Sequence, residues 1–364
     1  MQRVLVAMSG GVDSSVAAAL LKEQGYDLVG ITMNLACTTS SASGGCCSQA
    51  AAIDANKVSG QLGFPHYTLN FKAEFRRLVI DDFISEYRQG RTPNPCVRCN
   101  QFIKFDLLLS KARELGCDYV ATGHYARVYN LKPQNSNSKN MYHLIKGQDQ
   151  KKDQSYFLYR INQEQLAHTL FPLGEMTKEA VRQLAKQYKL PVAAKPESQE
   201  ICFVENDDYS DFIKTNAPEL VRPGKIVDTS GQVVGEHQGI AFYTIGQRKG
   251  LGAHLGGARY VVKIDVKRNE VVIGSDSETL KNELIADDLS FVCGHPPEKP
   301  LKIQAKIRYN TSAVEALLEV YSPAEGLQAQ VKFARPQRAV TPGQSVVFYN
   351  DEEVLGGGII SRED

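Results

Sequence analysis

Three short stretches of the sequence carry residues whose types and spacing could do chemistry. "RTPNPCVRCNQFIKF" (91–105) places Cys96 and Cys99 three residues apart behind two prolines, and "SQEICFV" contains Cys202. The third stretch, "AMSGGVDSS", begins at Ala7 and is rich in small residues. The two neighbouring cysteines could form part of a metal site, a redox pair, or a nucleophile with a partner. They could also be incidental thiols in a turn.

A closed structural zinc site is not expected, because the sequence has one CxxC and no second pair at zinc-ribbon spacing. Eight cysteines in 364 residues are too few for a disulfide scaffold. In the reducing cytosol a disulfide is more often transient or catalytic. We leave five cysteines as structural or incidental: Cys37, Cys46, Cys47, Cys117 and Cys293.

A thiolate is the reactive form of cysteine, and neighbouring cations favour it. Arg98 and Lys104 could therefore lower the pKa of Cys99 from its ordinary value of about 8.5. Cys202 stands between Ile201 and Phe203, which would also suit a small buried core residue.

The stretch "AMSGGVDSS" lies between a strand-like and a helix-like run. Ser9, Gly10 and Gly11 predict a tight turn whose backbone N–H groups converge on an anion, at the positive end of the next helix. Asp13 and Ser14 could cap that helix, or reach a phosphate and its magnesium ion. A glycine turn with an ordinary cap is the alternative, but S-G-G-x-D-S after a first strand is far more restrictive.

This loop resembles the pyrophosphate loop of the N-type ATP pyrophosphatases, and the lysine-bearing Walker pattern is absent. The resemblance implies that ATP and Mg²⁺ bind here and that an acceptor oxygen is adenylated, with release of pyrophosphate. It also implies that Met33 lies beside the adenine, with Gly123 at the same edge of the sheet. We see no amidotransferase domain that would supply ammonia, so the cysteines offer sulfur as the nucleophile.

The elements that must position these residues alternate between strand and helix over the first two hundred residues, which predicts an α/β domain with a mostly parallel sheet. An exposed hairpin loop is expected at 130–140. Thr177 is the predicted cap of a helix that ends before Pro191. The predicted strands are 3–8, 27–35, 66–71 and 118–125, and the predicted helices are 14–25, 48–63, 74–88, 105–115 and 177–190.

After about residue 215, short apolar runs are broken by Gly, Asn, Asp and Pro, which predicts small β domains or barrels. These runs are 241–247, 259–266, 270–274, 301–309, 327–334 and 344–349. We predict a catalytic domain of the ATP pyrophosphatase type at 1–205, a small central, mainly β domain at 206–280, and a C-terminal β-barrel at 281–364.

Composition describes an ordinary globular chain, with 42% hydrophobic and 23% charged residues. No apolar stretch approaches the roughly 20 residues of a membrane span, and the N-terminus has no signal-peptide pattern, so we expect a cytoplasmic protein without a membrane partner. The net charge of +1 does not indicate a nucleic-acid binder, but local basic patches can still neutralise phosphates.

Seven motifs together resemble one family, the tRNA-specific 2-thiouridylases (MnmA/TrmU). The resemblance implies ATP-dependent 2-thiolation of the wobble uridine (position 34) of tRNA, through adenylation of its C2 oxygen. The motifs are "AMSGGVDS", "GRTPNPCVRCNQFIKF", "ATGHYAR", "KDQSYFL", "ICFV", "YTIGQRKGLG" and "PGQSVVFY".

The resemblance assigns roles to individual residues. Cys99 matches the nucleophile, and Cys202 matches the cysteine that carries a persulfide. The positions that match ATP contacts are Ala7, Met8, Ser9, Gly10, Gly11, Val12, Asp13, Ser14, Met33 and Gly123. Asn94, Pro95 and Cys96 match contacts to the target base. The positions that match tRNA contacts are His124, Lys152, Asp153, Gln154, Arg308, Tyr309 and Gln344.

Position 96 departs from the family, many members of which have aspartate where this chain has Cys96. That aspartate is a natural candidate for proton transfer, and a thiol differs from it in pKa and in acceptor geometry. The role of Cys96 therefore stays open. In a second mechanism, Cys96, Cys99 and Cys202 would ligate three irons of a [4Fe–4S] cluster whose fourth iron binds sulfide.

The implied partners are the tRNAs for lysine, glutamate and glutamine, together with a cysteine desulfurase or sulfur-relay protein. One rival interpretation is an ATP pyrophosphatase that thiolates another nucleoside or a small acceptor. Another is a tRNA-binding module with a vestigial ATP loop, against which the intact Asp13, Cys99 and Cys202 argue.

Overall fold

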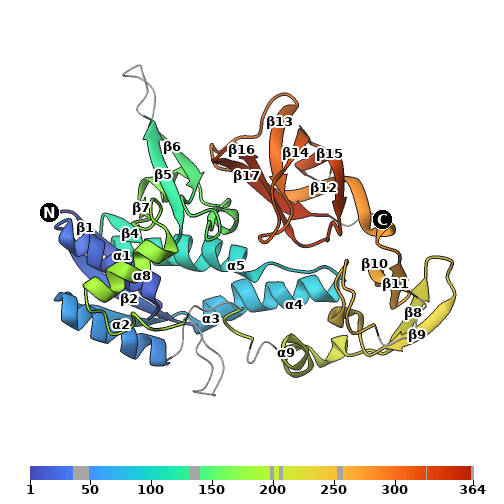
Figure 1. Ribbon diagram of the computed structural model, residues 1–364, viewed down its shortest axis with the longest axis horizontal. Coiled ribbons are helices and arrows are strands. Elements are labelled where there is room, and N and C mark those ends of the chain that lie inside the picture. Colours follow the sequence, from blue (N-terminus) through green and yellow to red (C-terminus); the bar gives the residue numbers. More distant parts are fainter. Residues whose placement is uncertain are drawn as a thin grey trace.

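The computed structural model describes residues 1–35, 49–131, 140–196, 201–204, 208–251, 257–324 and 326–361. Figure 1 shows a parallel sheet with helices near the N-terminus, a small β part, and a β-barrel near the C-terminus. A helical run that includes α4 extends from the first part toward the other two (Figure 1). Within the described ranges, no helix has the length and apolar character that a membrane crossing requires.

The N-terminal part contains a five-stranded parallel sheet in the order β3-β2-β1-β4-β7. Along β1, Leu5 packs into one core cluster, whereas Val4 and Val6 pack into another, because side chains alternate between the faces of a sheet. Both faces are therefore buried, as predicted for a parallel sheet. The strands are β1 (Arg3–Ala7), β2 (Asp27–Asn34), β3 (His66–Asn70), β4 (Tyr119–Ala121) and β7 (Thr169–Leu170).

Helices α1 (Val12–Glu23), α2 (Gln49–Leu62) and α8 (Lys178–Gln187) cover one face of this sheet. The predicted cap of α8 is confirmed: Thr177 Oγ1 accepts a hydrogen bond from the N–H of Ala180 at 3.2 Å. The other face is covered by a helical run whose parts are α3 (Lys72–Phe75), η1 (Arg76–Ile80), α4 (Asp81–Arg88), α5 (Pro95–Arg98), η2 (Cys99–Leu107) and α6 (Leu108–Glu114).

The second half of this helical run begins earlier than the sequence predicted. The prediction placed a helix at 105–115, but α5 begins at Pro95, and the π-helical segment η2 continues it without a break into α6. Proline suits the first turn of a helix, because its missing N–H has no intrahelical partner there. Cys96 and Cys99 therefore lie on a helix and not in a turn.

The central part contains α9 (Tyr209–Asn216) and a four-stranded sheet in the order β10-β11-β8-β9. This part is mainly β, but the predicted strand-like run 241–247 is not a strand. Residues 241 and 242 of this run belong to the 3₁₀ helix η6 (Ile240–Phe242), and the others form a turn with irregular backbone on either side. The strands are β8 (Gly224–Asp228), β9 (Val233–His237), β10 (Tyr260–Asp265) and β11 (Glu270–Gly274).

The C-terminal part is a closed antiparallel barrel in the order β12-β15-β14-β13-β16-β17, in which β12 also pairs with β17. The hairpin of β5 (Ala126–Leu131) and β6 (Met141–Lys146) adds to it through β17, so the barrel joins the N-terminal part. The tip of that hairpin, 132–139, lies outside the described residues. The barrel strands are β12 (Leu280–Phe291), β13 (Leu301–Lys306), β14 (Val314–Tyr321), β15 (Gln328–Arg338), β16 (Ser345–Asn350) and β17 (Glu353–Ile360).

The predicted fold class is thus confirmed: a parallel-sheet α/β domain, a small central part and a C-terminal barrel. Shorter elements connect these parts. They are η3 (Ser155–Phe157), α7 (Gln163–Ala167), η5 (Pro218–Leu220) and η7 (Ser277–Thr279).

Candidate active site

The predicted phosphate loop is a tight turn between β1 and α1. Gly10 has φ +65°, and a Cβ there would lie 2.3 Å from the carbonyl oxygen of Ala51 in α2, so this position requires glycine. The N–H of Ser9 donates to Ser14 Oγ at 3.2 Å, which ties the loop to the first turn of α1. The turn therefore aims the helix N-terminus at the space beyond the end of β1, where an anion can bind.

Gly123, which follows β4, lies against the start of α1. A Cβ there would lie 2.7 Å from the backbone nitrogen of Ser14 and 2.8 Å from the carbonyl carbon of Asp13. The strand order reverses between β1 and β4, and ligands of open parallel sheets bind at such a switch point. Met33 is buried near the end of the neighbouring strand β2. The structure thus brings the predicted ATP contacts to one edge of the sheet.

The carboxylate of Asp13 at this edge forms an ion pair with a lysine. The Nζ of Lys178 lies 2.6 Å and 2.8 Å from its two carboxylate oxygens, and the hydroxyl of Tyr125 donates to Oδ1 at 2.9 Å. Lys178 is buried in the first turn of α8. A second ammonium, that of Lys195, donates to the carbonyl of Gly10 at 3.0 Å and pairs with Asp54 at 2.8 Å.

Sequence reasoning missed these two lysines. Lys178 follows a good N-cap, but nothing in its neighbourhood along the chain indicates that it points to a loop more than 160 residues earlier. The signal that could have found it is a lysine in the first turn of a helix, where a carboxylate is the favoured residue.

The sulfur-bearing residues are grouped around the core cluster on the other face of the sheet. Cys99 begins η2, is half-buried, and packs against this cluster. Cys202 is exposed, so it is not the small core residue that its neighbours would allow. Phe203, the next residue, is buried against three aromatic rings at centroid distances of 5.2–5.7 Å: Phe75, Phe83 and Phe212.

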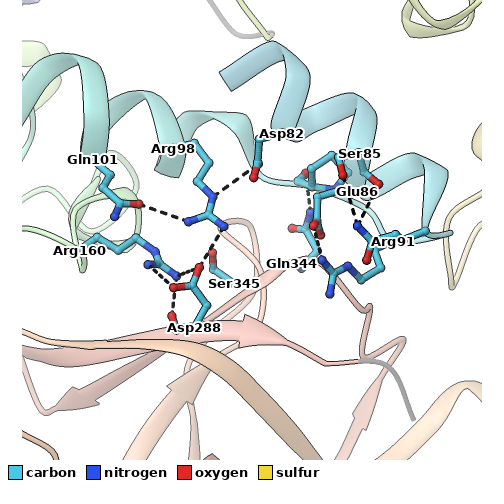
Figure 2. A network of polar contacts seen from close by, with 12 residues as sticks. Asp82, Ser85, Glu86, Arg91, Arg98, Gln101, Arg160, Asp288, Gln344 and Ser345 are labelled. Carbon is cyan, nitrogen blue, oxygen red and sulfur yellow. Dashed lines mark hydrogen bonds and ion pairs between the residues drawn. The ribbon is translucent and has the colours of Figure 1, made fainter. Parts of the chain in front are cut away.

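The barrel holds the segment between Thr92 and Cys99. The side-chain amide of Gln344 donates to the carbonyls of Thr92 and Pro93 at 3.0 and 3.1 Å. Figure 2 shows the guanidinium of Arg98 between Asp82 of α4 and Asp288 of the barrel, at 3.5 and 3.0 Å. The charge of Arg98 is therefore shared with two carboxylates, and its predicted effect on the thiol of Cys99 stays a prediction.

Comparison with known proteins identifies the family of this chain. A model of the tRNA methyl transferase HUP domain matches residues 2–206, the PRC-barrel domain of that family matches 210–275, and an aminomethyltransferase beta-barrel domain matches 281–360. The tRNA-specific 2-thiouridylase MnmA of Acetivibrio thermocellus is 51% identical over 363 residues, which cover 99% of both chains. The enzyme of that name from Carboxydothermus hydrogenoformans is 52% identical over 365 residues, covering 99% of this chain and 98% of its own. The chain belongs to the tRNA-specific 2-thiouridylase family.

The positions that we predict to contact tRNA lie in two groups. The first surrounds Tyr125, the residue that also contacts Asp13. Gln154 Oε1 accepts the N–H of Tyr125 at 3.0 Å, and the buried carboxylate of Asp153 accepts the N–H groups of Gly147 and Ser155 at 2.9 and 3.1 Å. The backbone N–H of Lys152 donates to the carbonyl of Asp149 at 3.0 Å.

His124 belongs to the same group and is buried between the rings of Phe105 and Phe171. Its Nδ1 lies 2.7 Å from Thr122 Oγ1. Burial, aided by the positive charge of Lys104, holds the pKa of His124 well below its ordinary value. Its imidazole is therefore neutral at pH 7.

The second group of predicted tRNA contacts lies on the barrel side of the target-base segment, which is the stretch from Asn94 to Cys96. Tyr309 packs on Phe157 with ring centroids 4.5 Å apart. Arg308 donates to the carbonyl of Ile245 at 3.3 Å and to Thr341 Oγ1 at 2.5 Å, so it joins the central part to the barrel. Together with Gln344, these residues lie around the chain segment that contains Asn94 to Cys96. Their contacts to tRNA stay predictions.

The cysteines that the structure describes in this 2-thiouridylase family member are not arranged as a metal site. Among the residues that the structure describes, no three His, Cys, Asp or Glu side chains are grouped so that they could hold a metal ion. Cys96, Cys99 and Cys202 are all described, so the three ligands of the [4Fe–4S] hypothesis are not assembled in this structure. Cys37, Cys46 and Cys47 lie outside the described residues.

Proposed function

We propose that this protein thiolates C2 of the wobble uridine (position 34) of tRNA in an ATP-dependent reaction. The observation that carries the proposal is the shared location of Cys99 and the Cys202 segment. Cys99, Ile201 and Val204 pack on one core cluster, so the segments that carry the two cysteines, far apart in the sequence, share this cluster. The phosphate loop lies at the edge of the sheet that this cluster covers.

The loop edge suits activation of the uridine. The C2 oxygen attacks the α-phosphorus of ATP, which forms an O–P bond and releases pyrophosphate, so AMP becomes the leaving group at C2. Backbone N–H groups of Gly10 and Gly11 and the ammonium of Lys195 would bind the phosphates. The carboxylate of Asp13 offers the hard oxygen ligands that Mg²⁺ prefers, and it would bind the ion in place of the ammonium that it accepts at 2.6 Å. When bound, Mg²⁺ would screen the charge of the phosphates.

The sulfur step then uses the two cysteines. A persulfide on Cys202, loaded by a cysteine desulfurase or sulfur-relay protein, supplies the sulfane sulfur. In one order of events, the thiolate of Cys99 attacks Sγ of Cys202 and releases hydrosulfide. The hydrosulfide then attacks C2 and displaces AMP. In the other, the persulfide displaces AMP first, and Cys99 then cleaves the S–S bond. Either order leaves a Cys99–Cys202 disulfide, which a dithiol reductant must reduce before the next turnover.

The base must leave the anticodon stack before its C2 oxygen can react. Asn94, Pro95 and Cys96 would receive it at the start of α5. The side chain of Tyr156 is hydrogen-bonded to that of Asn94, and its hydroxyl donates to the carbonyl of Ser345 at 2.8 Å. The barrel therefore also supports the segment at Asn94. We propose the tRNAs for lysine, glutamate and glutamine as substrates.

Mass spectrometry of nucleosides tests the proposal. Transcripts of these tRNAs are incubated with the protein, Mg²⁺-ATP, and a desulfurase with cysteine. We expect 2-thiouridine at position 34 only when ATP and the sulfur source are both present. Thiolation at another position, or none with a competent sulfur source, would reject the proposed function.

Iron analysis tests the persulfide route against the cluster route. After anaerobic reconstitution with iron and sulfide, we expect less than stoichiometric iron, and undiminished thiolation by protein that was purified with a chelator. A stoichiometric cluster that is needed for activity would contradict the persulfide route.

A further inference from the structure

The C-terminal barrel contacts the target-base segment on both of its sides. On the N-terminal side, the N–H of Thr92 donates to the carbonyl of Pro342 at 2.8 Å, and Gln344 binds the carbonyls of Thr92 and Pro93. The turn is close-packed here, since a Cβ on Gly343 would lie 2.8 Å from the nitrogen of Thr92. On the C-terminal side, Asp288 binds Arg98. Only residues 94–97 lie between these two attachments.

Asp288 is held in place by a second arginine. Arg160, whose side chain is 5% exposed, donates from Nη1 to Asp288 Oδ1 at 3.1 Å and from Nη2 to the carbonyl of Asp288 at 2.6 Å, and Nη2 also lies 2.9 Å from Oδ2. The Nε of Arg160 donates to the hydroxyl of Tyr159 at 3.0 Å, and that hydroxyl lies 3.3 Å from Ser345 Oγ. Figure 2 shows both guanidinium groups directed at this one carboxylate.

The backbone at Asp288 is unusual. Asp288 has φ +46°, and the pairing of β12 with β17 shifts between Asp287 and Ser290. A residue other than glycine in this region is strained, and it persists only where its surroundings fix it. The irregularity turns the carboxylate of a barrel strand toward the helix that carries Cys99.

We propose that Asp288 is a positioning residue for the sulfur-transfer helix, by which we mean the continuous helical run from Pro95 to Glu114 that carries Cys99. By holding Arg98, Asp288 fixes the start of η2 and the orientation of Cys99. This inference rests on the proposed function for its consequence, since the barrel is where tRNA is expected to bind. Asp288 touches no reacting atom and acts through Arg98. The two arginines and the carboxylates of Asp82 and Asp288 balance in charge, so loss of Asp288 leaves two guanidinium groups with one carboxylate.

Three variants and one double variant test this coupling. Asp288→Asn removes the shared acceptor charge. Arg98→Lys keeps the positive charge but loses the planar fork, and it leaves the ion pair of Asp288 with the buried Arg160 intact, so folding is spared. Glu352→Gln is the matched control, because Glu352 pairs with Arg127 at 2.8 Å between the same two parts of the chain, away from Cys99. The double variant combines Asp288→Asn with Arg98→Lys.

We expect kcat for thiolation to fall about 10- to 100-fold in each of the first two variants, with KM for tRNA nearly unchanged, because a misplaced thiol slows the chemical step. The double variant should be no slower than the worse single variant, since both act through one contact. Glu352→Gln should match the parent. Thermal unfolding confirms that each variant is folded.

The rate at which iodoacetamide alkylates Cys99, followed by mass spectrometry of its peptide, gives a readout that needs no tRNA. We expect this rate to change in Asp288→Asn and Arg98→Lys but not in Glu352→Gln. If the parent enzyme makes no 2-thiouridine, the proposed function fails while alkylation still tests the coupling. Parent-like kcat and alkylation in folded Asp288→Asn, or single-variant effects that multiply in the double variant, would overturn the inference.

Discussion

The phosphate loop and the sulfur-transfer helix differ in what holds them. The loop from Ala7 to Ser14 is fixed from within its own domain, by the close approach of Gly10 to α2 and of Gly123 to the start of α1. The segment from Thr92 to Cys99 is held from outside, by Gln344 and Asp288 of the barrel. The first region needs only its own sheet, whereas the second needs the C-terminal part to be correctly placed.

This difference has a consequence for catalysis. A loop that is complete within one domain is ready for ATP whether or not tRNA is bound. A thiol whose helix is fixed by the proposed tRNA-binding barrel can respond to the substrate. We therefore expect variants of the two regions to separate ATP binding from sulfur transfer.

The largest separation is expected for Cys99→Ser. A serine hydroxyl does not cleave an S–S bond, so thiolation should fall by at least about 10³-fold, as for the loss of other catalytic nucleophiles. ATP affinity, measured by calorimetry, should stay at the parent value because Cys99 is not part of the phosphate loop. A Cys117→Ser variant is the control, since that buried thiol lies elsewhere in the same domain. Thiolation at a parent-like rate in Cys99→Ser would reject the role of this residue.

For Lys178→Met we expect the reverse result: weaker binding of Mg²⁺-ATP and an unchanged reactivity of Cys99. This change removes the cation from the carboxylate of Asp13 at the loop. Once Mg²⁺ binds Asp13, the ammonium of Lys178 would donate to the phosphates of ATP instead. Charge-assisted hydrogen bonds contribute about 1.5–3 kcal/mol, so without this donor we expect the affinity for Mg²⁺-ATP to fall about 10- to 100-fold. Calorimetry measures this affinity, and alkylation of Cys99 should keep its parent rate.

Lys22→Met serves as the control for Lys178→Met. Lys22 lies on the same helix as Asp13, but its ammonium donates to the carbonyl of Gly63 at 3.3 Å, away from the loop. If Lys178→Met binds Mg²⁺-ATP as tightly as Lys22→Met, the ammonium of Lys178 has no part in nucleotide binding.

The sequence predicted the first region better than the second for a physical reason. Between β1 and α1, neighbours in the sequence are neighbours in space, so turn residues and a helix start identify the site. The contact between Asp13 and Lys178, and that between Arg98 and Asp288, join residues more than 160 positions apart. Local patterns do not encode such pairs. The helix start at Pro95 was missed because two prolines and an asparagine are also typical of a turn.

A smaller effect is expected at acidic pH, on the stability of the folded protein. His124 follows Gly123 on the ATP side, and burial holds its folded-state pKa well below the unfolded value of 6.5. The unfolded chain therefore binds more protons below about pH 6.5. Stability should be constant above that pH and should decline as the pH falls toward the folded-state pKa. Urea denaturation between pH 7.5 and pH 5 measures this decline.

His124→Gln should make that acid slope shallower, because glutamine takes up no proton. His66 and His237, whose pKa values burial also lowers, should account for the slope that remains. An unchanged slope in His124→Gln would show that this histidine does not couple protonation to folding.

The smallest effect is expected at position 96, where we predicted a departure from the aspartate of the family. Cys96 is exposed near the start of the continuous helix from Pro95 to Glu114, whose positive end favours a carboxylate. Cys96→Asp should therefore raise the free energy of unfolding by about 0.3–1 kcal/mol at low ionic strength, as measured by urea denaturation. Cys96→Asn has nearly the same shape without the charge and should give less than half of this gain. Equal stability of the Asp and Asn variants, or a gain that survives 1 M salt, would contradict an interaction with the helix dipole.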